Sequence, residues 1–256
     1  MKILTTVAEW NDYRGSLVQG NRIRALGFVP TMGALHAGHR SLLRQSQQEN
    51  SCTVASIFVN PTQFNQAVDL ATYPRPAEQD LAMLRQQGVD AVFTPGYPDL
   101  YPDDYRYRVS ESGISQRFCG AHRPGHFEGV LTVVMKLLNI VRPDRAYFGE
   151  KDYQQLHLIR GLIAAFFLPV EIRSCPVVRE TDGLAMSSRN RRLDAQQRRQ
   201  AARLYRALKN GSSPRQVRDE LEQAGFDVDY VEDFDGRRLA AASLGSTRLI
   251  DNVPLG

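Results

Sequence analysis

Short apolar runs alternate with amphipathic segments along the first two thirds of the chain. The runs are rich in Val, Ala and Phe, which is typical of buried strands, and apolar residues between them recur at helical spacing. Strands are predicted at 25–29, 53–59, 91–93, 145–148 and 170–178. Helices are predicted around Leu42 and over 78–87, 130–141 and 153–167. The alternation predicts an α/β fold, a doubly wound Rossmann-like parallel sheet that binds ligands beyond the carboxyl ends of its strands.

The pattern changes after residue 178, where a polar stretch runs through Asn190. Helices over 195–210 and 214–223 and short strands near 228–233 and 247–251 are predicted beyond it. We therefore expect two domains, a Rossmann-like domain at 1–176 and a smaller C-terminal α+β domain at 177–256. The segment 97–107 is rich in Pro, Asp and Tyr and is predicted to be a long surface loop.

The composition is that of a globular protein, with 42% hydrophobic and 23% charged residues. The cysteines Cys52, Cys119 and Cys175 are too few and too far apart for a disulfide framework or a metal knuckle. This indicates the reducing cytoplasm, with the cysteines as packing residues. The longest apolar run, 130–141, contains Lys136 and is too short to span a bilayer, so we expect no membrane role.

The formal net charge is +4, and much of the excess lies in two arginine-rich stretches. Arg198, Arg199, Arg203 and Arg206 decorate one predicted helix. Such a helix could bind nucleic acid, but a solvated surface is the commoner explanation and is the one we favour.

The turn after the first predicted strand has two histidines three residues apart, His36 and His39. At a helix entrance this spacing places both imidazoles beside free backbone N–H groups and the positive end of the helix dipole, where a polyphosphate fits. Gly33 and Gly38 let nucleotide and backbone approach closely. A surface accident or half of a metal site is the alternative, but no third His or Cys stands at ligand spacing.

Two further loops follow predicted strands and carry phosphate-binding side chains. Ser187, Ser188 and Arg189 can give hydroxyl and bidentate guanidinium donors, although a linker with a helix N-cap has the same pattern. Lys151 can neutralise phosphate oxygens, and the simpler alternative is a helix start capped by Asp152.

The pair formed by the His36–His39 turn and the sequence AMSSR at 185–189 resembles a superfamily signature. The superfamily contains class I aminoacyl-tRNA synthetases and nucleotidyltransferases, in which the second loop is usually written KMSKS. Longer strings are more specific and occur in this order in pantothenate synthetases, also called pantoate–β-alanine ligases. They cover 28–39, 58–64, 123–127, 143–155, 186–190 and 247–252.

This resemblance implies an ATP-dependent ligase. Pantoate and ATP would give enzyme-bound pantoyl adenylate and pyrophosphate, and β-alanine would then attack the acyl carbon to give pantothenate and AMP. The domain at 1–176 would bind ATP and pantoate, and the C-terminal domain would act as a lid. The resemblance also implies Mg²⁺ held mainly through the ATP phosphates, no protein metal ligand, and a homodimer.

The resemblance assigns site residues by position. Those implied to contact ATP are Met32, Gly33, Ala34, Leu35, His36, Ala37, Gly38, His39, Gly149, Glu150, Lys151, Asp152, Val178, Met186, Ser187, Ser188 and Arg189. Those implied to be catalytic are His36, His39, Lys151, Ser187, Ser188 and Arg189, with His39 as proton donor. Those implied to hold pantoate or β-alanine are Asn60, Gln63, Arg123 and Gln155. The chain departs from the family pattern at 65–69 and in a shortened C-terminal domain.

Two other functions fit parts of the pattern. A nucleotidyltransferase that joins a nucleotidyl group to a small phosphorylated acceptor would use the same two motifs. It would need a cationic pocket where Gln63 and Gln155 stand. An RNA-binding module would use the arginine-rich helix and would be indifferent to ATP.

Overall fold

The computed structural model describes residues 1–20 and 24–255, and within it the chain forms two compact units. Unit 1 consists of Met1–Leu35, His39–Phe148 and Gln155–Cys175. Unit 2 consists of His36–Gly38, Gly149–Gln154 and Pro176–Gly256. The chain therefore passes between the units several times before the long C-terminal segment begins.

A six-stranded sheet forms the centre of unit 1. Its strands are β1 (Lys2–Leu4), β2 (Leu26–Thr31), β3 (Cys52–Ile57), β4 (Ala91–Phe93), β5 (Arg145–Gly149) and β6 (Glu171–Cys175). The order is β1-β4-β3-β2-β5-β6, and β2 pairs in parallel with both β3 and β5. The chain winds outward from β2 in both directions, so the predicted doubly wound sheet is confirmed, with its switch point between β2 and β5.

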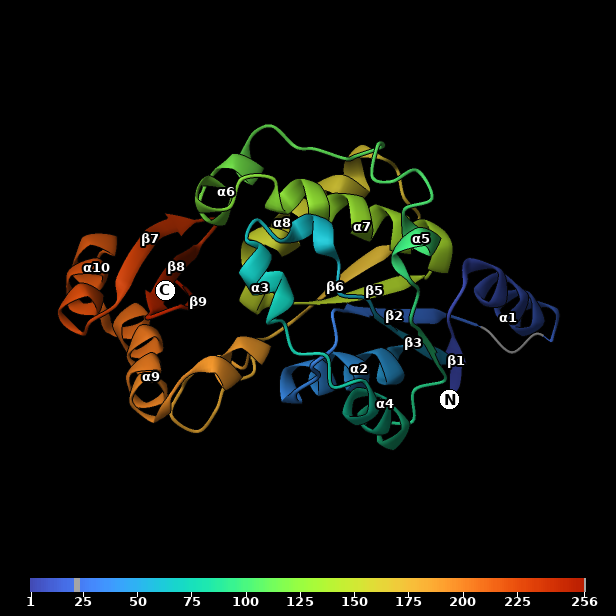
Figure 1. Ribbon diagram of the computed structural model, residues 1–256, viewed down its shortest axis with the longest axis horizontal. Coiled ribbons are helices and arrows are strands. Elements are labelled where there is room, and N and C mark those ends of the chain that lie inside the picture. The colour runs from blue at the N-terminus through green and yellow to red at the C-terminus, as the bar shows by residue number, and fades with distance from the viewer. Residues whose placement is uncertain (21–23, 256) are drawn as a thin grey trace. The chain divides into compact units, whose positions relative to one another are not determined.

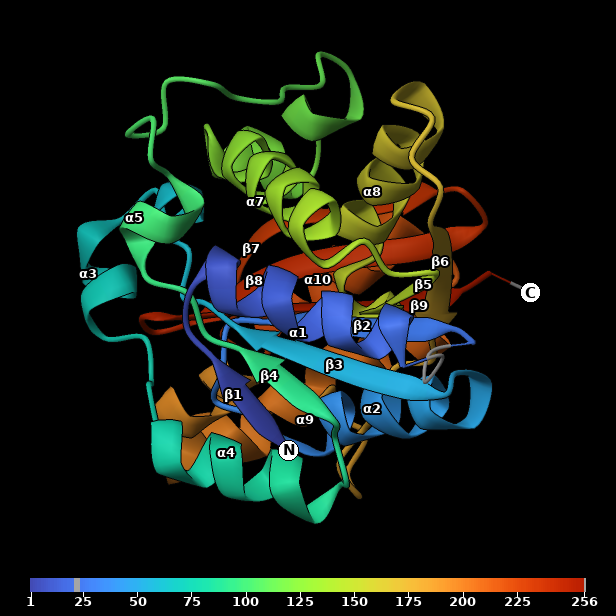
Figure 2. The same ribbon diagram turned by 90° about the vertical axis from the view of Figure 1, so that its right-hand side faces the viewer.

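Helices cover both faces of this sheet. The long ones are α1 (Val7–Gln19), α2 (Ala37–Glu49), α4 (Ala77–Gln86), α7 (His126–Val141) and α8 (Tyr153–Ala165). Helices α2 and α4 lie on one face, and α1, α7 and α8 lie on the other (Figure 2). The short helices are η1 (Pro61–Gln63), α3 (Ala67–Ala71), α5 (Tyr97–Leu100), η2 (Ile114–Gln116), α6 (Cys119–His122) and η3 (Glu150–Asp152).

The core of unit 1 lies between the sheet and these helices. Val29 and Val92 from the strands pack with Leu43 and Leu84 from α2 and α4. Helix α7 is buried along most of its length, and Lys136, the charge within its apolar run, forms an ion pair with Asp103 at 2.9 Å. All three cysteines are buried. No helix of residues 1–20 and 24–255 has the length and apolar character needed to cross a membrane.

Some boundaries differ from the sequence predictions. The last strand, β6, ends at Cys175 and does not extend to residue 178, because Pro176 lacks the N–H that would continue the ladder. Strand β1 and helix α1 were not predicted. Helix α1 begins with a capping box between Thr6 and Glu9, and Trp10 donates from its indole to the carbonyl of Ile140 at 2.8 Å.

The prediction that 97–107 forms a long surface loop needs correction. It begins with the short helix α5, and Tyr101 just after it is only 2% exposed. The ring of Tyr101 packs against Tyr97 at 4.9 Å and Tyr105 at 5.5 Å between centroids. Three tyrosines of this segment, Tyr97, Tyr101 and Tyr105, form an aromatic cluster, because their rings are apolar and only their hydroxyls need polar partners, whereas Tyr107 is exposed.

Unit 2 is a small α+β structure (Figure 1). An antiparallel sheet of β7 (Asp227–Phe234), β8 (Arg237–Leu244) and β9 (Thr247–Pro254) packs with helices α9 (Ala195–Asn210) and α10 (Pro214–Gln223). The loop before α9 contains the short helix η4 (Ser188–Arg192). Both long helices have the bounds predicted from sequence, since Asp194 and Ser213 cap their N-termini and Pro214 occupies the first helical position of α10.

Strand β8 was not predicted. Its centre reads Ala240-Ala241-Ala242, and alanine has a low β propensity. All three alanines are fully buried. Ala240 and Ala242 belong to the core that the sheet forms with α9 and α10, where small side chains leave room for the helices, so packing overrides the local preference.

Candidate functional site

The turn after β2 is held by a buried carboxylate. Asp80, on α4 and 2% exposed, accepts the backbone N–H groups of Ala34 at 2.7 Å and Leu35 at 2.8 Å. Gly33 and Ala34 both have positive φ angles, 77° and 50°. A side chain on Gly33 would place its Cβ 2.9 Å from an Asp80 oxygen, so glycine is needed for space as well as for conformation. The turn at the start of the predicted nucleotide site is therefore rigid.

His36, in unit 2, is arranged as a neutral hydrogen-bond donor. The backbone N–H of Gly38 donates to its Nδ1 at 3.1 Å, so in the neutral ring the proton is on Nε2. Burial, followed by the positive charges of Lys151 and Arg191, lowers the pKa of His36 to about 4. At neutral pH the ring therefore offers one N–H donor and no charge.

Lys151 lies in η3, and the C-terminal strand β9 holds the backbone of η3. The Asn252 side-chain amide donates to the carbonyls of Glu150 at 2.9 Å and Lys151 at 3.1 Å. Arg237 in turn donates to the Asn252 side-chain oxygen at 2.6 Å and forms an ion pair with Glu150 at 3.4 Å. Asn252 is 1% exposed, so this clamp is part of the interior of unit 2.

The loop that carries Ser187–Arg189 is anchored by backbone pairing. Met186 donates from its N–H to the carbonyl of Val178 at 2.9 Å, and Arg179 and Ala185 form an isolated antiparallel bridge. Ser187 caps η4, its hydroxyl accepting the N–H of Arg189 at 3.3 Å.

An ion pair with a buried carboxylate contacts the same loop, through a bond from Arg179 to the carbonyl of Gly183 at 3.1 Å. The guanidinium of Arg179 makes two bonds to the carboxylate of Asp251, at 2.6 and 3.0 Å, and stacks on the ring of Tyr205 at 3.7 Å. The loop thus has a fixed base within unit 2.

Unit 2 brings together many of the residues predicted to contact ATP. A Cβ on Gly38 would meet the His36 ring at 2.8 Å and the Met186 Cβ at 3.9 Å. The turn that carries His36 and the loop that carries Ser187–Arg189 (the serine loop) are therefore neighbours. The predicted ATP-binding residues in unit 2 are His36, Ala37, Gly38, Gly149, Glu150, Lys151, Asp152, Val178, Met186, Ser187, Ser188 and Arg189. Those in unit 1 are Met32, Gly33, Ala34, Leu35 and His39.

The predicted pantoate residues Asn60, Gln63 and Arg123 lie together in unit 1. The Asn60 amide donates to the Gln63 side-chain oxygen at 3.1 Å, and Arg123 donates to the Gln63 carbonyl at 3.4 Å. His126 contacts both, with Nδ1 2.8 Å from the Gln63 carbonyl and Nε2 3.0 Å from Arg123. Because guanidinium only donates, Nε2 accepts and Nδ1 carries the proton. Gln155 lies in the first turn of α8 and is partly exposed.

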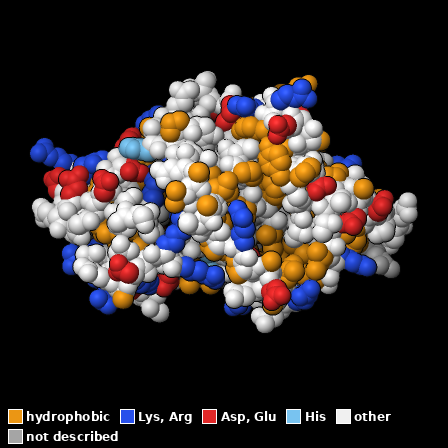
Figure 3. Space-filling model, in the orientation of Figure 1, with side chains coloured by type: hydrophobic (Ala, Val, Ile, Leu, Met, Phe, Trp, Pro, Cys, Tyr) orange, Lys and Arg blue, Asp and Glu red, His pale blue; other side chains and the backbone are white. Residues whose placement is uncertain are grey.

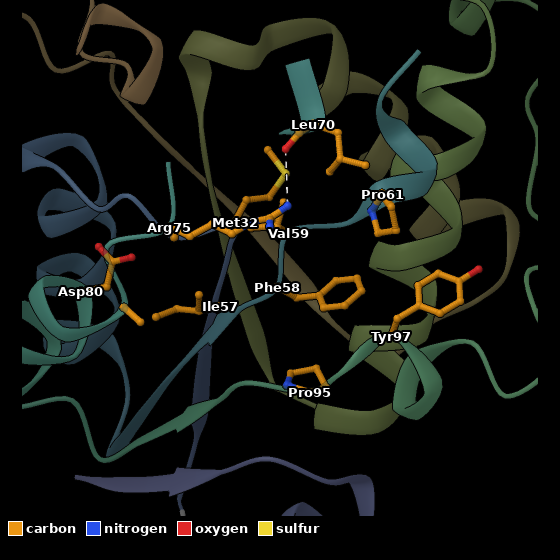
Figure 4. Close-up of a pocket in the computed structure, with 12 residues that line it drawn as sticks. Met32, Ile57, Phe58, Val59, Pro61, Leu70, Arg75, Asp80, Pro95 and Tyr97 are labelled. Carbon is orange, nitrogen blue, oxygen red and sulfur yellow. Dashed lines mark hydrogen bonds between the residues drawn. The ribbon is translucent and has the colours of Figure 1, made fainter. Parts of the chain in front are cut away.

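An open cleft of about 420 Å³ lies beside the turn in unit 1 (Figure 4). Its walls are mainly apolar, and they include Met32 and Gly33 from the turn, Phe58 after β3 and Tyr97 on α5. Arg75 donates to the carbonyl of Leu70 at 3.4 Å on one side of it. Figure 3 shows hydrophobic side chains gathered over and beside α5.

No three His, Cys, Asp or Glu side chains in residues 1–20 and 24–255 are grouped so that they could hold a metal ion. The site contains the carboxylates of Asp80, Glu150 and Asp152, and the predicted ligand-binding residues also supply amides, hydroxyls and cations, which suit an anionic organic ligand.

The family model for pantoate-beta-alanine ligase matches residues 2–254. The chain belongs to the pantoate-beta-alanine ligase family. It is 56% identical over 230 residues to pantothenate synthetase of Bdellovibrio bacteriovorus, covering 90% of this chain and 92% of the relative. It is 51% identical over 255 residues to pantothenate synthetase of Legionella pneumophila, covering 100% of both.

Solved structures of pantoate-beta-alanine ligases have the same fold. The Francisella tularensis enzyme, complexed with beta-gamma ATP and beta-alanine, superimposes with a TM-score of 0.94 at 40% identity and covers 99% of this chain and 97% of its own. Pantothenate synthetase from Thermus thermophilus gives a TM-score of 0.89 at 41% identity, with 99% of each chain covered. The α/β class with a small second α+β part is therefore shared along the whole length of the family members.

Several polar residues of the site were not assigned from sequence. Those with the most direct contacts to the predicted residues are Asp80, Tyr101, His126 and Asn252, and Arg179, Arg237 and Asp251 support the site through them or through the loops. His126 and Asn252 lie within the sequence segments that carry the family resemblance. Their position indicates that they matter for the site, but it does not indicate what they do there. Asp80 and Tyr101 have no local signal, because each acts on a segment about 40 positions away along the chain.

Proposed function

We propose that this member of the pantoate-beta-alanine ligase family condenses pantoate with β-alanine at the expense of ATP. The products are pantothenate, AMP and pyrophosphate, and pantoyl adenylate is the enzyme-bound intermediate. The observation that carries the proposal is the family match over residues 2–254. The Francisella relative, complexed with beta-gamma ATP and beta-alanine, supports ATP and β-alanine as ligands.

The adenylation step is an in-line attack of the pantoate carboxylate on the α-phosphate of ATP. Such a step needs placement and charge stabilisation more than covalent catalysis. His36 supports this role, because the Nε2–H group of its neutral imidazole can donate a hydrogen bond to a phosphate oxygen. Lys151 supplies a cation in the same unit, and Ser187, Ser188 and Arg189 supply hydroxyl and guanidinium donors. His39 is the proposed proton donor.

Magnesium is proposed to enter with ATP and to be held mainly by its phosphates. The amides and cations of the site fit this arrangement, since hard divalent cations prefer carboxylate and phosphate oxygens. When bound, Mg²⁺ would neutralise charge that develops on the phosphates.

Pantoate is proposed to bind at Gln63 and Gln155, with Arg123 beside Gln63. Neutral amides can orient hydroxyl and carboxylate oxygens without the strong pairing by which a lysine would weaken the attacking carboxylate. We also propose that the enzyme is a cytoplasmic homodimer, which sedimentation at several concentrations would test. The role of residues 177–256 as a lid remains a prediction.

Exchange of labelled pyrophosphate into ATP tests the proposal directly. We expect exchange that requires pantoate and proceeds without β-alanine. Exchange that instead required a phosphorylated acceptor would indicate a nucleotidyltransferase, and ATP-independent, salt-sensitive RNA binding would indicate an RNA-binding module.

Two variants test the placement of the phosphates. His39→Ala and Lys151→Ala should each slow exchange by about a hundredfold, the scale of losing one oriented transition-state donor. Arg203→Ala, on the exposed side of α9, is the control and should exchange like the wild type. Full exchange in both site variants would contradict the assignment.

A further inference from the structure

The side chain of Asn60 makes as many hydrogen bonds as an amide can. Its nitrogen donates to the Gln63 side-chain oxygen at 3.1 Å and to the Gly129 carbonyl at 3.2 Å. Its oxygen accepts from the hydroxyls of Tyr101 at 2.8 Å and Thr62 at 3.0 Å. Asn60 is 1% exposed. It therefore has no capacity left for a substrate, although sequence reasoning placed it among the substrate-binding residues.

The direction of this amide is fixed by chemistry as well as by geometry. The Gly129 carbonyl, on α7, can only accept a hydrogen bond, so the Asn60 nitrogen must face it. The Asn60 oxygen must then face Tyr101, which leaves the phenolic hydroxyl as donor. A flipped Asn60 would set its oxygen against the Gly129 carbonyl oxygen and lose that bond.

The same reasoning extends to Gln63. Its side-chain oxygen accepts from the Asn60 nitrogen, so this bond fixes which end of the Gln63 amide faces Asn60. The other end of the amide is the NH₂ group, which only donates. A ligand atom that meets this NH₂ group must therefore be an acceptor, such as a carboxylate or hydroxyl oxygen.

We propose that Tyr101 is a positioning residue for the pantoate-binding step. The Tyr101 hydroxyl orients the Asn60 amide, and the bond from Asn60 then directs the Gln63 NH₂ group toward an oxygen of pantoate. The inference rests on the proposed function for the identity of the ligand. It adds a residue that contacts no substrate and states which end of the Gln63 amide the substrate meets.

The surroundings of Tyr101 suit a fixed donor. Its ring is held between Tyr97 and Tyr105 and lies 4.9 Å from the Lys136 ammonium. Burial raises the pKa of Tyr101 to about 12, so the hydroxyl keeps its proton at any pH at which the enzyme is assayed. The position of the hydroxyl therefore depends on packing, and its role as donor does not change with pH.

Tyr101→Phe is the first test, because it removes only the hydroxyl and keeps the ring in the cluster. We expect the KM for pantoate in pyrophosphate exchange to rise about three- to tenfold, the scale of one neutral hydrogen bond, with kcat and the KM for ATP within twofold of wild type. An unchanged pantoate KM would overturn the inference. Equal losses in ATP and pantoate binding would also overturn it, because they would indicate a general loss of structure.

Tyr147→Phe is the matched control. Tyr147 is also fully buried, and its hydroxyl also joins a polar network, with Asn50 at 2.6 Å and Glu49 at 2.9 Å. This variant should lower the unfolding temperature as Tyr101→Phe does and leave the pantoate KM unchanged. A rise in the pantoate KM as large as that of Tyr101→Phe would contradict a specific role for Tyr101.

A second pair of variants tests the coupling to Gln63. In a Gln63→Ala background, Tyr101→Phe should change the pantoate KM less than twofold, because the group that it positions is gone. Gln63→Glu replaces the donor with an acceptor and should raise the pantoate KM at least about tenfold. Additive effects in the double variant, or normal pantoate binding by Gln63→Glu, would overturn the inference.

Failure of the inference is distinguishable from failure of the proposed function. Wild-type exchange that does not depend on pantoate would contradict the function itself. Pantoate-dependent exchange that is unaffected by Tyr101→Phe would leave the function intact and remove only the role of Tyr101.

Discussion

Asp80 uses both oxygens of one carboxylate to hold two successive backbone N–H groups. Its partners, Ala34 and Leu35, lie 46 and 45 positions earlier in the chain. In the folded protein this carboxylate substitutes for the peptide partners that a tight turn cannot provide. The turn that begins the predicted nucleotide site is therefore fixed before a ligand arrives.

Asp80→Asn should loosen this turn. The new NH₂ group would face an N–H donor, so one charge-assisted bond is lost and a donor is left without an acceptor. We expect a loss of about 1.5–3 kcal/mol in the free energy of unfolding and a fall of about tenfold in pyrophosphate exchange. Urea denaturation and the exchange assay measure the two effects. Glu78→Gln, an exposed change on the same helix, should alter neither.

The protonation of His36 gives a pH prediction. Its pKa in the folded protein is about 4, below the ordinary histidine value of 6.5. Between these two values the unfolded chain binds more protons than the folded one, so His36 destabilises the fold as pH falls through this range. His36→Gln removes this contribution. Its unfolding temperature relative to wild type should therefore rise as pH is lowered from about 7 to about 5. A constant difference across this range would contradict the neutral state of His36.

Such contacts explain which parts of the site could be predicted from sequence. Residues in strings, such as His36, Lys151 and Ser187, follow strands and enter helices, and this local context is visible in a sequence. Asp80 and Tyr101 are recognisable only by what they contact after folding, 46 and 41 positions away. A buried carboxylate and a buried tyrosine have no periodic pattern of their own, so sequence reasoning could not single them out.

At the scale of elements, local chemistry decided which predictions succeeded. The approximate bounds predicted for helices α9 and α10 agree with the structure, in which caps and a proline at the first turn define the helix starts. Strand β8 was missed because alanine has a low β propensity, although Ala240 and Ala242 suit close packing against α9 and α10. Helix α7 begins four residues earlier than predicted, because His126 and Phe127 do not extend the apolar run that marks the rest of the helix.

The clamp between β9 and η3 is an interaction between elements. Asn252→Ala would leave the Glu150 and Lys151 carbonyls and the Arg237 guanidinium without this partner. We expect exchange to fall about tenfold with little change in the pantoate KM, because the variant displaces Lys151, the residue proposed to bind phosphate, and not the residues proposed to bind pantoate. Arg248→Ala is the control on the same strand, since Arg248 pairs with Asp229. Equal losses in the two variants would indicate a general effect on β9.

At the scale of the whole molecule, the fold class was predicted from the alternation of strands and helices, which extends over most of the chain. The two compact units of the structure do not correspond to two continuous stretches of the chain. Short segments such as Gly149–Gln154 join unit 2 through contacts with β9 that are about 100 positions away. A single domain boundary in the sequence cannot describe a unit that is made of three separate stretches of the chain.

Metal removal separates catalysis from folding in the whole enzyme. If Mg²⁺ is held by ATP, EDTA should abolish pyrophosphate exchange and added Mg²⁺ should restore it. The unfolding temperature without ATP should stay within about 1 °C, because a metal that does not bind the free protein cannot stabilise it. A large drop in unfolding temperature on chelation would indicate a metal site in the protein itself.

The interleaving of the two units limits how this enzyme can be divided or recombined. A fragment that starts at Pro176 would contain the serine loop but would leave His36–Gly38 and Gly149–Gln154 behind. If only the C-terminal segment were exchanged with that of a relative, the β9 of one protein would have to pack against the Gly149–Gln154 segment of the other. Chimaeras within the family should therefore work best when all three stretches are transferred together, and natural recombination at a single crossover would tend to produce mismatched partners.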